Sequence, residues 1–176
     1  MYKLKKTITF IHRKKLINLI TMTLNKGDKA PNFKLFDTDK NEVSLESNKG
    51  KKVVLLFFPL AFTGVCTQEL CGVRDDLASY DGLDANVYGV SVDSVFSLGK
   101  FKAEQNINFP LLSDFNKDAS KSYGALYDEF VLGMQGVSKR SAFVVDEEGV
   151  IQYASVSDDA GQLPDFKAIK DTLASL

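Results

Sequence analysis

Residues 53–66 read VVLLFFPLAFTGVC, an apolar run of strand length that ends at a proline and leads into a short turn-like segment. A continuous apolar run, as opposed to an alternating one, is typical of a strand buried on both faces of a sheet. After Thr63 and Gly64 the period changes to spacings of four, three and four residues, which define one helix face: Cys66, Leu70, Val73 and Leu77. This stretch therefore predicts a buried strand that leads through a short loop into an α-helix, with Cys66 in its first turn.

The segments around this unit alternate between strand and helix patterns. Expected strands are 33–37 and 42–45 as a hairpin, then 87–92, 109–113, and 141–145 with 150–156 as a second hairpin. Expected helices are 96–105 after the N-cap candidates Asp93 and Ser94, 118–123 stopping at Gly124, and a last helix opened by Pro164. This order predicts an α/β fold with a central mixed sheet and helices on both faces. A thioredoxin-like fold fits the pattern, and so do other three-layer sandwiches.

The bulk composition describes one globular domain with a separate basic tail. The 176 residues suit a single domain, and 44% of them are hydrophobic. The net charge of −1 gives no reason to expect nucleic acid or a membrane surface as a partner. Residues 1–21 carry six Lys or Arg and no acid, so removing those six charges leaves −7 for the remainder.

We therefore divide the chain into a basic tail, residues 1–24, and a domain, residues 25–176. The tail lacks the pattern of a secretory signal, because the basic cluster at 12–15 splits it, and it is too short and too charged to span a bilayer. Three interpretations remain open: a disordered basic arm, a weak targeting segment, or translated sequence upstream of a start at Met22. We favour the last.

The two cysteines, Cys66 and Cys71, form one close pair, from which no disulfide framework can be built. We expect a reducing compartment, the cytoplasm, where such a pair is more often catalytic than structural. The single histidine, His12, lies in the tail, so the domain has no histidine for a Ser–His–Asp or Cys–His site. A structural zinc site would need about four ligands, usually Cys and His, which this domain does not offer.

The predicted position of Cys66 favours a reactive thiolate. The first amides of a helix have no intrahelical acceptor and carry partial positive charge, which stabilises an anionic sulfur. The same amides can hold a peroxide oxygen as charge develops on it. Position alone does not decide the matter, because a cysteine near a helix start is more often inert packing.

The spacing Pro59-x-x-x-Thr63-x-x-Cys66 resembles the active-site motif of the peroxiredoxins. Residues 57–66 look like the alkyl hydroperoxide reductase E branch, whereas Cys71 and the Gly-Val-Arg-Asp after it resemble the bacterioferritin-comigratory branch. Further matches follow in the family's order at 109–114, 123–124 and 139–146, so the resemblance covers residues 25–175. It implies a thioredoxin-like fold and a thiol-dependent peroxidase that needs no cofactor.

The resemblance also implies a role for each matching residue. Cys66 would be the peroxidatic cysteine and Cys71 the resolving thiol. Thr63 would hydrogen-bond the peroxide or the thiolate, and Pro59 would shield the sulfur. Arg140 would polarise the thiolate and the peroxide, and Glu69 would orient that arginine. Simpler roles remain open for several of them. Pro59 could only end a strand, Thr63 only cap the helix, Glu69 only favour the helix dipole, and Arg140 be an ordinary surface charge.

The resemblance implies that the protein reduces hydrogen peroxide and organic hydroperoxides through a sulfenic acid. Its expected partner is a thioredoxin-like or other dithiol reductant, and we expect a monomer or a homodimer. Five residues turn a helix by about 500°, leaving Cys66 and Cys71 about 140° apart around its axis. A disulfide needs converging Cβ vectors. We therefore predict that residues 64–72 unfold locally before an intramolecular disulfide closes. Alternatively, Cys71 is a bystander and an outside thiol resolves the sulfenic acid.

Other functions stay open at this point. A thioredoxin-like disulfide oxidoreductase would usually space its cysteines as Cys-x-x-Cys, whereas four residues separate this pair. A redox sensor would share the Cys66 chemistry but turn over poorly, and an inert binding module would not use it. The loop 125–138 has apolar residues that could line a peroxide entrance, form a subunit contact or simply cover the core: Tyr127, Phe130, Val131, Leu132 and Met134.

Overall fold

The computed structural model describes residues 24–176, and in this part of the chain seven strands form one mixed sheet in the order β2-β1-β5-β4-β3-β6-β7. The strands are β1 (Lys34–Asp37), β2 (Glu42–Ser44), β3 (Lys52–Phe57), β4 (Ala85–Ser91), β5 (Leu111–Ser113), β6 (Ser141–Val145) and β7 (Ile151–Val156). Strands β3, β4 and β5 run parallel to one another, and the remaining pairs are antiparallel. The predicted hairpins, β1–β2 and β6–β7, are both present.

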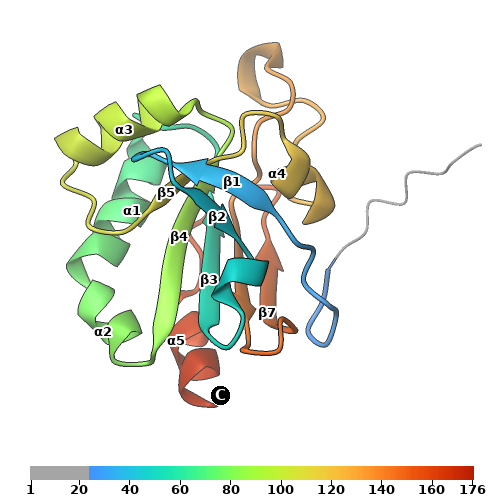
Figure 1. Cartoon of the computed structure of the whole chain (residues 1–176). Helices are drawn as coiled ribbons and strands as arrows, with labels where there is room; N and C mark the ends of the chain where they lie inside the picture. The colour runs from blue at the N-terminus through green and yellow to red at the C-terminus, as the bar shows by residue number, and fades with distance from the viewer. Residues whose placement is uncertain (1–23) are drawn as a thin grey trace, which may run out of the picture.

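Helices cover both faces of this sheet, as the alternation of patterns predicts (Figure 1). They are α1 (Gly64–Asp75), α2 (Leu77–Asp81), α3 (Val95–Glu104), α4 (Asp118–Ser122) and α5 (Phe166–Ala174), with 3-10 turns η1 (Glu46–Asn48) and η2 (Val131–Gly133). The core on one face takes side chains from α1, α2, α3 and α5, and the core on the other takes them from α4 and the chain before β1. The expected central mixed sheet with helices on both faces is confirmed.

Strand β3 is the centre of the molecule. Its apolar run divides between the two cores with period two, because Val54 and Leu56 face one core while Val53, Leu55 and Phe57 face the other. Parallel pairing with β4 and antiparallel pairing with β6 bury it on both edges as well. A continuous hydrophobic sequence is what such a position requires.

The register between β3 and β6 fixes what lies at the carboxyl end of β3. Phe57 pairs with Ser141, the first residue of the antiparallel strand β6. The residue before Ser141 therefore lies beside the chain that leaves β3. In this way residues more than seventy positions apart meet at one edge of the sheet.

Three local predictions need correction. The helix expected to run through Leu77 ends at Asp75, and Leu77 begins α2 after a break at Asp76, which has non-helical dihedrals. The last helix begins at Phe166 with Asp165 as its N-cap, so Pro164 precedes the helix instead of opening it. Of the two N-cap candidates before α3, only Ser94 accepts a hydrogen bond, from the Ser97 amide.

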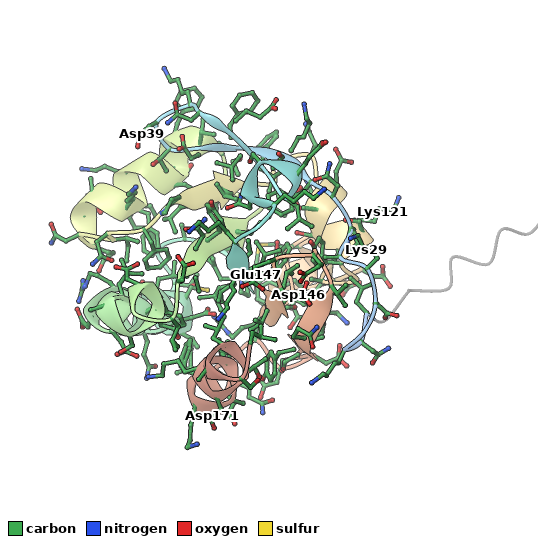
Figure 2. The ribbon with its side chains drawn as sticks, turned by 60° about the horizontal axis from the view of Figure 1, so that its bottom comes forward. Lys29, Asp39, Lys121, Asp146, Glu147 and Asp171 are labelled. Atoms are coloured by element: carbon green, nitrogen blue, oxygen red, sulfur yellow. The ribbon has the colours of Figure 1, made fainter. Side chains whose placement is uncertain are left out.

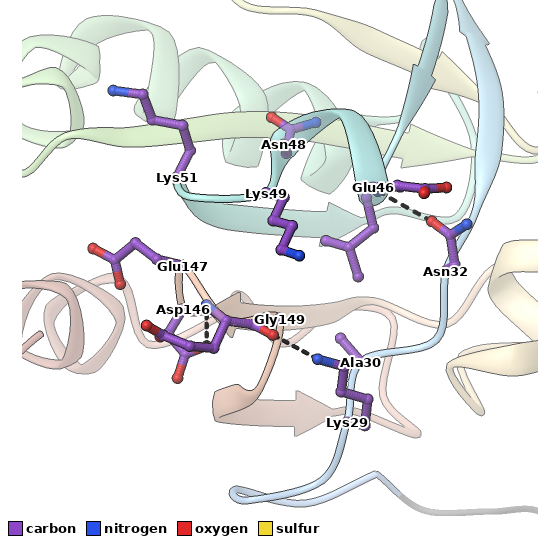
Figure 3. Close-up of a pocket in the computed structure, with 12 residues that line it drawn as sticks. Lys29, Ala30, Asn32, Glu46, Asn48, Lys49, Lys51, Asp146, Glu147 and Gly149 are labelled. Atoms are coloured by element: carbon purple, nitrogen blue, oxygen red, sulfur yellow. Dashed lines mark hydrogen bonds between the residues drawn. The ribbon is translucent and has the colours of Figure 1, made fainter.

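The chain that leads into β1 is held at the opposite end of the sheet. The Gly27 amide donates to the Ile151 carbonyl at 2.8 Å and the Ala30 amide to the Gly149 carbonyl at 3.0 Å. A cavity of about 300 Å³ lies along this seam, and its lining residues Lys29, Asp146 and Glu147 lie at the same end of the molecule (Figures 2 and 3). Leu24 packs into the core beneath α4, whereas the tail through residue 23 and the start proposed at Met22 lie outside the described residues.

Candidate active site

Cys66 is the third residue of α1, in the first helical turn, where the sequence predicts it. Its side chain is 1% exposed. A cavity of about 310 Å³ reaches it, lined by Pro59, Thr63, Gly64, Val65, Cys66, Phe130, Val131, Arg140, Ala160 and Gly161. The sulfur is therefore buried beneath the protein surface and yet borders a hollow that a small molecule can enter.

The side chain of Arg140 reaches Cys66 from the residue before β6. Its Nη2 donates to Cys66 Sγ at 3.4 Å, its Nε donates to the Ala160 carbonyl at 2.9 Å, and its Nη1 pairs with Glu69. The guanidinium is 2% exposed, so the interpretation of Arg140 as an ordinary surface charge is wrong. A buried guanidinium held on three sides presents fixed positive charge to the sulfur.

Glu69 lies one helical turn after Cys66 and its side chain is fully buried. Burial raises the pKa of this carboxyl to about 7, and the charge and hydrogen bond of Arg140 act in the opposite direction. Only Oε2 contacts Arg140; Oε1 has no hydrogen-bond partner within residues 24–176. The carboxyl is thus a counter-charge for Arg140 placed where its own ionised form is poorly stabilised.

Thr63 and Pro59 belong to the loop between β3 and α1, and both line the Cys66 cavity. The Thr63 hydroxyl donates to the Leu60 carbonyl at 2.8 Å. Thr63 occupies the N-cap position of α1, but its side chain makes no capping hydrogen bond, so the capping interpretation is wrong. Phe62 adopts φ +62°, an uncommon value for a residue with a side chain, which means that the surrounding contacts fix this loop.

Asp93 is a contributor to this loop that sequence reasoning missed. Its Oδ2 accepts the Ala61 amide at 2.8 Å and the Ser91 hydroxyl at 2.5 Å. Asp93 follows β4, whose carboxyl end lies beside that of β3, so the carboxylate ties the loop to the neighbouring strand. In the sequence an acid before a helix pattern indicated an N-cap, and only the pairing of β3 with β4 reveals the actual partner.

Cys71 is half-buried and is not among the residues that line the Cys66 cavity. Its Sγ accepts a hydrogen bond from Arg74 Nη1 at 3.4 Å and lies 3.9 Å from Gln105 Oε1, just beyond α3. Both cysteines are free thiols. The structure thus brings Cys66, Glu69, Arg140, Thr63 and Pro59 together, and it leaves Cys71 against another part of the fold.

Two residues of the loop at 125–138 border the site. Phe130 and Val131 line the Cys66 cavity, which supports the interpretation of this loop as part of the peroxide entrance. Leu132 is 96% exposed, and Tyr127 stacks on Phe130 with ring centroids 5.1 Å apart. One wall of the cavity mouth is therefore apolar.

No group of three or more His, Cys, Asp or Glu side chains within residues 24–176 could hold a metal ion. None of the helices described there has both the length and the apolar character needed to cross a membrane.

Comparisons with known proteins agree with the geometry. Residues 26–154 match the AhpC/TSA family. A putative peroxiredoxin of Mycobacterium tuberculosis is 42% identical over 136 residues, 76% of this chain and 86% of that protein. Alkyl hydroperoxide reductase E of Mycobacterium bovis is 36% identical over 156 residues, 87% of this chain and 98% of that protein.

Solved structures give the same answer for the fold. The crystal structure of peroxidoxin BcpB from Mycobacterium tuberculosis has a TM-score of 0.77 at 27% identity, covering 87% of this chain and 98% of that one. The reduced 2-Cys peroxiredoxin of Plasmodium vivax has a TM-score of 0.76 at 30% identity, covering 85% of this chain and 80% of that one.

Proposed function

The chain belongs to the AhpC/TSA family of peroxiredoxins, and from that premise we propose that its thiol-dependent peroxidase activity passes through a sulfenic acid on Cys66. Membership gives the chain a thioredoxin-like fold and places it among the antioxidant oxidoreductases that reduce peroxides with thiols. One observation supports the assignment to Cys66 above the others. A buried guanidinium, Arg140, donates to its sulfur at 3.4 Å beside a cavity.

The first step follows from this arrangement. The Cys66 thiolate attacks the distal oxygen of the hydroperoxide, the O–O bond breaks, and the leaving oxygen takes up a proton and departs as an alcohol or water. Cys66 is oxidised to the sulfenic acid and the peroxide is reduced. Arg140, the Thr63 hydroxyl and the first amides of α1 stabilise the charge that passes between the oxygens.

The apolar wall formed by Phe130 and Val131 supports organic hydroperoxides as substrates beside hydrogen peroxide. An alkyl chain would cover these side chains and displace water from them. Competition between cumene hydroperoxide and hydrogen peroxide tests this, and equal rate constants for the two would contradict a selective entrance.

We assign resolution to Cys71, which would condense with the sulfenic acid to give an intramolecular disulfide and water. Cys71 packs against the end of α3 and not in the Cys66 cavity, so this reaction needs the local unfolding of residues 64–72. A thioredoxin-like dithiol in a reducing compartment, the cytoplasm, would then restore both thiols. An oxidised structure with a Cys66–Cys71 bond and an intact helix would contradict the unfolding step.

Stopped-flow mixing of the full chain with hydrogen peroxide tests the function directly. Cys66→Ser should abolish peroxide reduction, whereas Cys71→Ser should keep the first oxidation and lose turnover with a thioredoxin system. Peroxide reduction by the Cys66→Ser chain at the wild-type rate would refute the assignment. Unchanged turnover of Cys71→Ser would leave Cys66 in its role and give resolution to an outside thiol.

A further inference from the structure

The surroundings of Cys71 repeat those of Cys66. Arg74 Nη1 donates to Cys71 Sγ at 3.4 Å, the same distance that separates Arg140 Nη2 from Cys66 Sγ. Arg74 comes from the next turn of the same helix, so this contact does not depend on a distant strand.

Each guanidinium is also fixed in the same manner, by one carboxylate and one backbone carbonyl. Arg140 uses Glu69 and the carbonyl of Ala160. Arg74 pairs with Asp75 through two hydrogen bonds, Nε to Oδ1 at 2.8 Å and Nη2 to Oδ2 at 3.1 Å, and its Nη1 donates to the Gln105 carbonyl at 2.6 Å. A guanidinium locked in this way keeps its charge pointed at the sulfur without further loss of side-chain freedom.

We propose that Arg74 activates Cys71 as the resolving nucleophile, by stabilising its thiolate and holding it at the end of α3. This inference rests on the proposed function of Cys66. The Cys71 thiolate attacks the sulfenic sulfur of Cys66, the S–S bond forms and the S–O bond breaks. The departing hydroxide recombines with the proton that Cys71 released, so one water leaves and no outside oxidant is consumed.

The same contacts decide which cysteine moves. Arg74 ties the second half of α1 to the chain after α3, through the Gln105 carbonyl and through Asn108 Nδ2, which donates to the Arg74 carbonyl at 3.1 Å. In the described part of the chain, the outer side of the first turn of α1 makes no such contact, and Thr63, Gly64 and Thr67 there are exposed or only half-buried. When residues 64–72 unwind, the contacts of Arg74 keep the Cys71 end of the segment close to α3, so Cys66 makes the larger movement.

Charge around Cys71 comes from few groups. Within residues 24–176 Arg74 Nη1 donates to the Cys71 sulfur, the Cys71 thiol donates to the neutral Gln105 Oε1, and Asp75 faces the guanidinium and not the sulfur. Asp75 raises the pKa of Arg74 through its hydrogen bond, and Cys71 raises it further, so the guanidinium is charged at every working pH. Because the side chain of Arg74 is 26% exposed, solvent weakens its effect on Cys71.

The test uses the full chain with Cys66→Ser, in which Cys71 is the only thiol. The rate of alkylation by iodoacetamide is measured from pH 6 to pH 10, and the rate at pH 7 is divided by the alkaline plateau. This ratio reports the thiolate fraction and cancels differences in access to the sulfur. Arg74→Gln, which keeps a donor for the Gln105 carbonyl, should lower the ratio about three- to tenfold.

Two further variants separate activation from simple anchoring. Asp75→Asn removes the charge that opposes Arg74 and should raise the ratio. Asn108→Ala loosens the anchor without changing any charge and should leave the ratio unchanged. A ratio that Arg74→Gln does not lower overturns the proposal, and so does a fall that Asn108→Ala reproduces. If Arg74→Gln does not fold by circular dichroism, the direction of the Asp75→Asn change decides.

Resolution itself is followed with both cysteines present. The chain is mixed with one equivalent of hydrogen peroxide, quenched at intervals and analysed by mass. Arg74→Gln should slow disulfide formation about three- to tenfold and leave sulfenic acid formation at Cys66 at the wild-type rate. Equal disulfide rates overturn the role of Arg74. Absence of any sulfenic acid refutes the proposed function instead, and the alkylation ratio then still decides whether Arg74 activates Cys71.

Discussion

Replacement of Glu69 by glutamine should change how the stability of the protein depends on pH. Glu69 is fully buried, and burial raises its pKa from 4.5 to about 7, although Arg140 acts in the opposite direction. Between these two values the folded protein retains a proton that the unfolded chain has released. The contribution of this carboxyl to stability is therefore complete below pH 4.5 and is lost as the pH rises through 7.

The size of this effect follows from the two pKa values. A carboxyl whose pKa rises from 4.5 to about 7 on folding destabilises the native state by about 3 kcal/mol once the pH exceeds both. The Glu69→Gln side chain has nearly the same shape and does not ionise. The difference in unfolding free energy, wild type minus variant, should therefore fall by about 3 kcal/mol between pH 4.5 and pH 8.

Urea unfolding followed by far-ultraviolet circular dichroism, in reducing buffer and at half-unit steps of pH, measures this difference. The matched control is Glu104→Gln, because Glu104 is an exposed glutamate paired with Lys100 on α3. Its curve should run parallel to that of the wild type. A wild-type minus Glu69→Gln difference that stays constant across the range would refute the reasoning by showing that folding leaves the pKa of Glu69 at its ordinary value. A difference that rises with pH would refute it by showing that folding lowers this pKa.

Three other substitutions probe the site. Arg140→Met leaves the buried Glu69 carboxyl without its cation, so it should lower the unfolding free energy by about 3–5 kcal/mol in urea titrations. It should also slow peroxide reduction about a hundredfold or more in stopped flow. A rate within threefold of the wild type would contradict this. Thr63→Val should slow peroxide reduction about ten- to a hundredfold while Thr63→Ser retains it, and an equal loss in both would point to the methyl group instead. Asp93→Ala removes the acceptor of the Ala61 amide and should destabilise the protein by about 1–3 kcal/mol. It should also slow the first oxidation, and the same two assays measure both effects. Wild-type values in both would exclude a role for this carboxylate in shaping the loop.

Local patterns in the sequence were sufficient for the elements on which the site is built. The change from a continuous apolar run to a helical period places a buried strand before Cys66 and puts the sulfur in the first turn of α1, because the side chains of adjacent residues decide both features. Glu69, one turn further on, follows from the same period. The break at Asp76 could not be read from the apolar pattern, since Leu77 keeps the spacing and only its surroundings end the helix.

The meeting of Arg140 with Cys66 depends on tertiary structure. The residues are 74 positions apart, and it is the antiparallel register of β6 on β3, with Ser141 opposite Phe57, that delivers the guanidinium to the sulfur. Resemblance to a family suggested the pair, but no periodicity or spacing in this chain could. A register is set by how the whole sheet packs its two cores, and that information is spread over the entire domain.

For Asp93 and Cys71 too, the sequence predicted the element, and only the tertiary structure revealed the partner. The sequence shows an acid before a helix and a thiol five residues after another, and both observations are correct. Their partners, the Ala61 amide and the Gln105 side chain, come from other elements. The sequence by itself determined on which element each of these residues lies, because short-range sterics and burial decide that. Only the folded chain decided which charge faces which sulfur, because electrostatic contacts act over a few ångströms and packing of distant segments creates them.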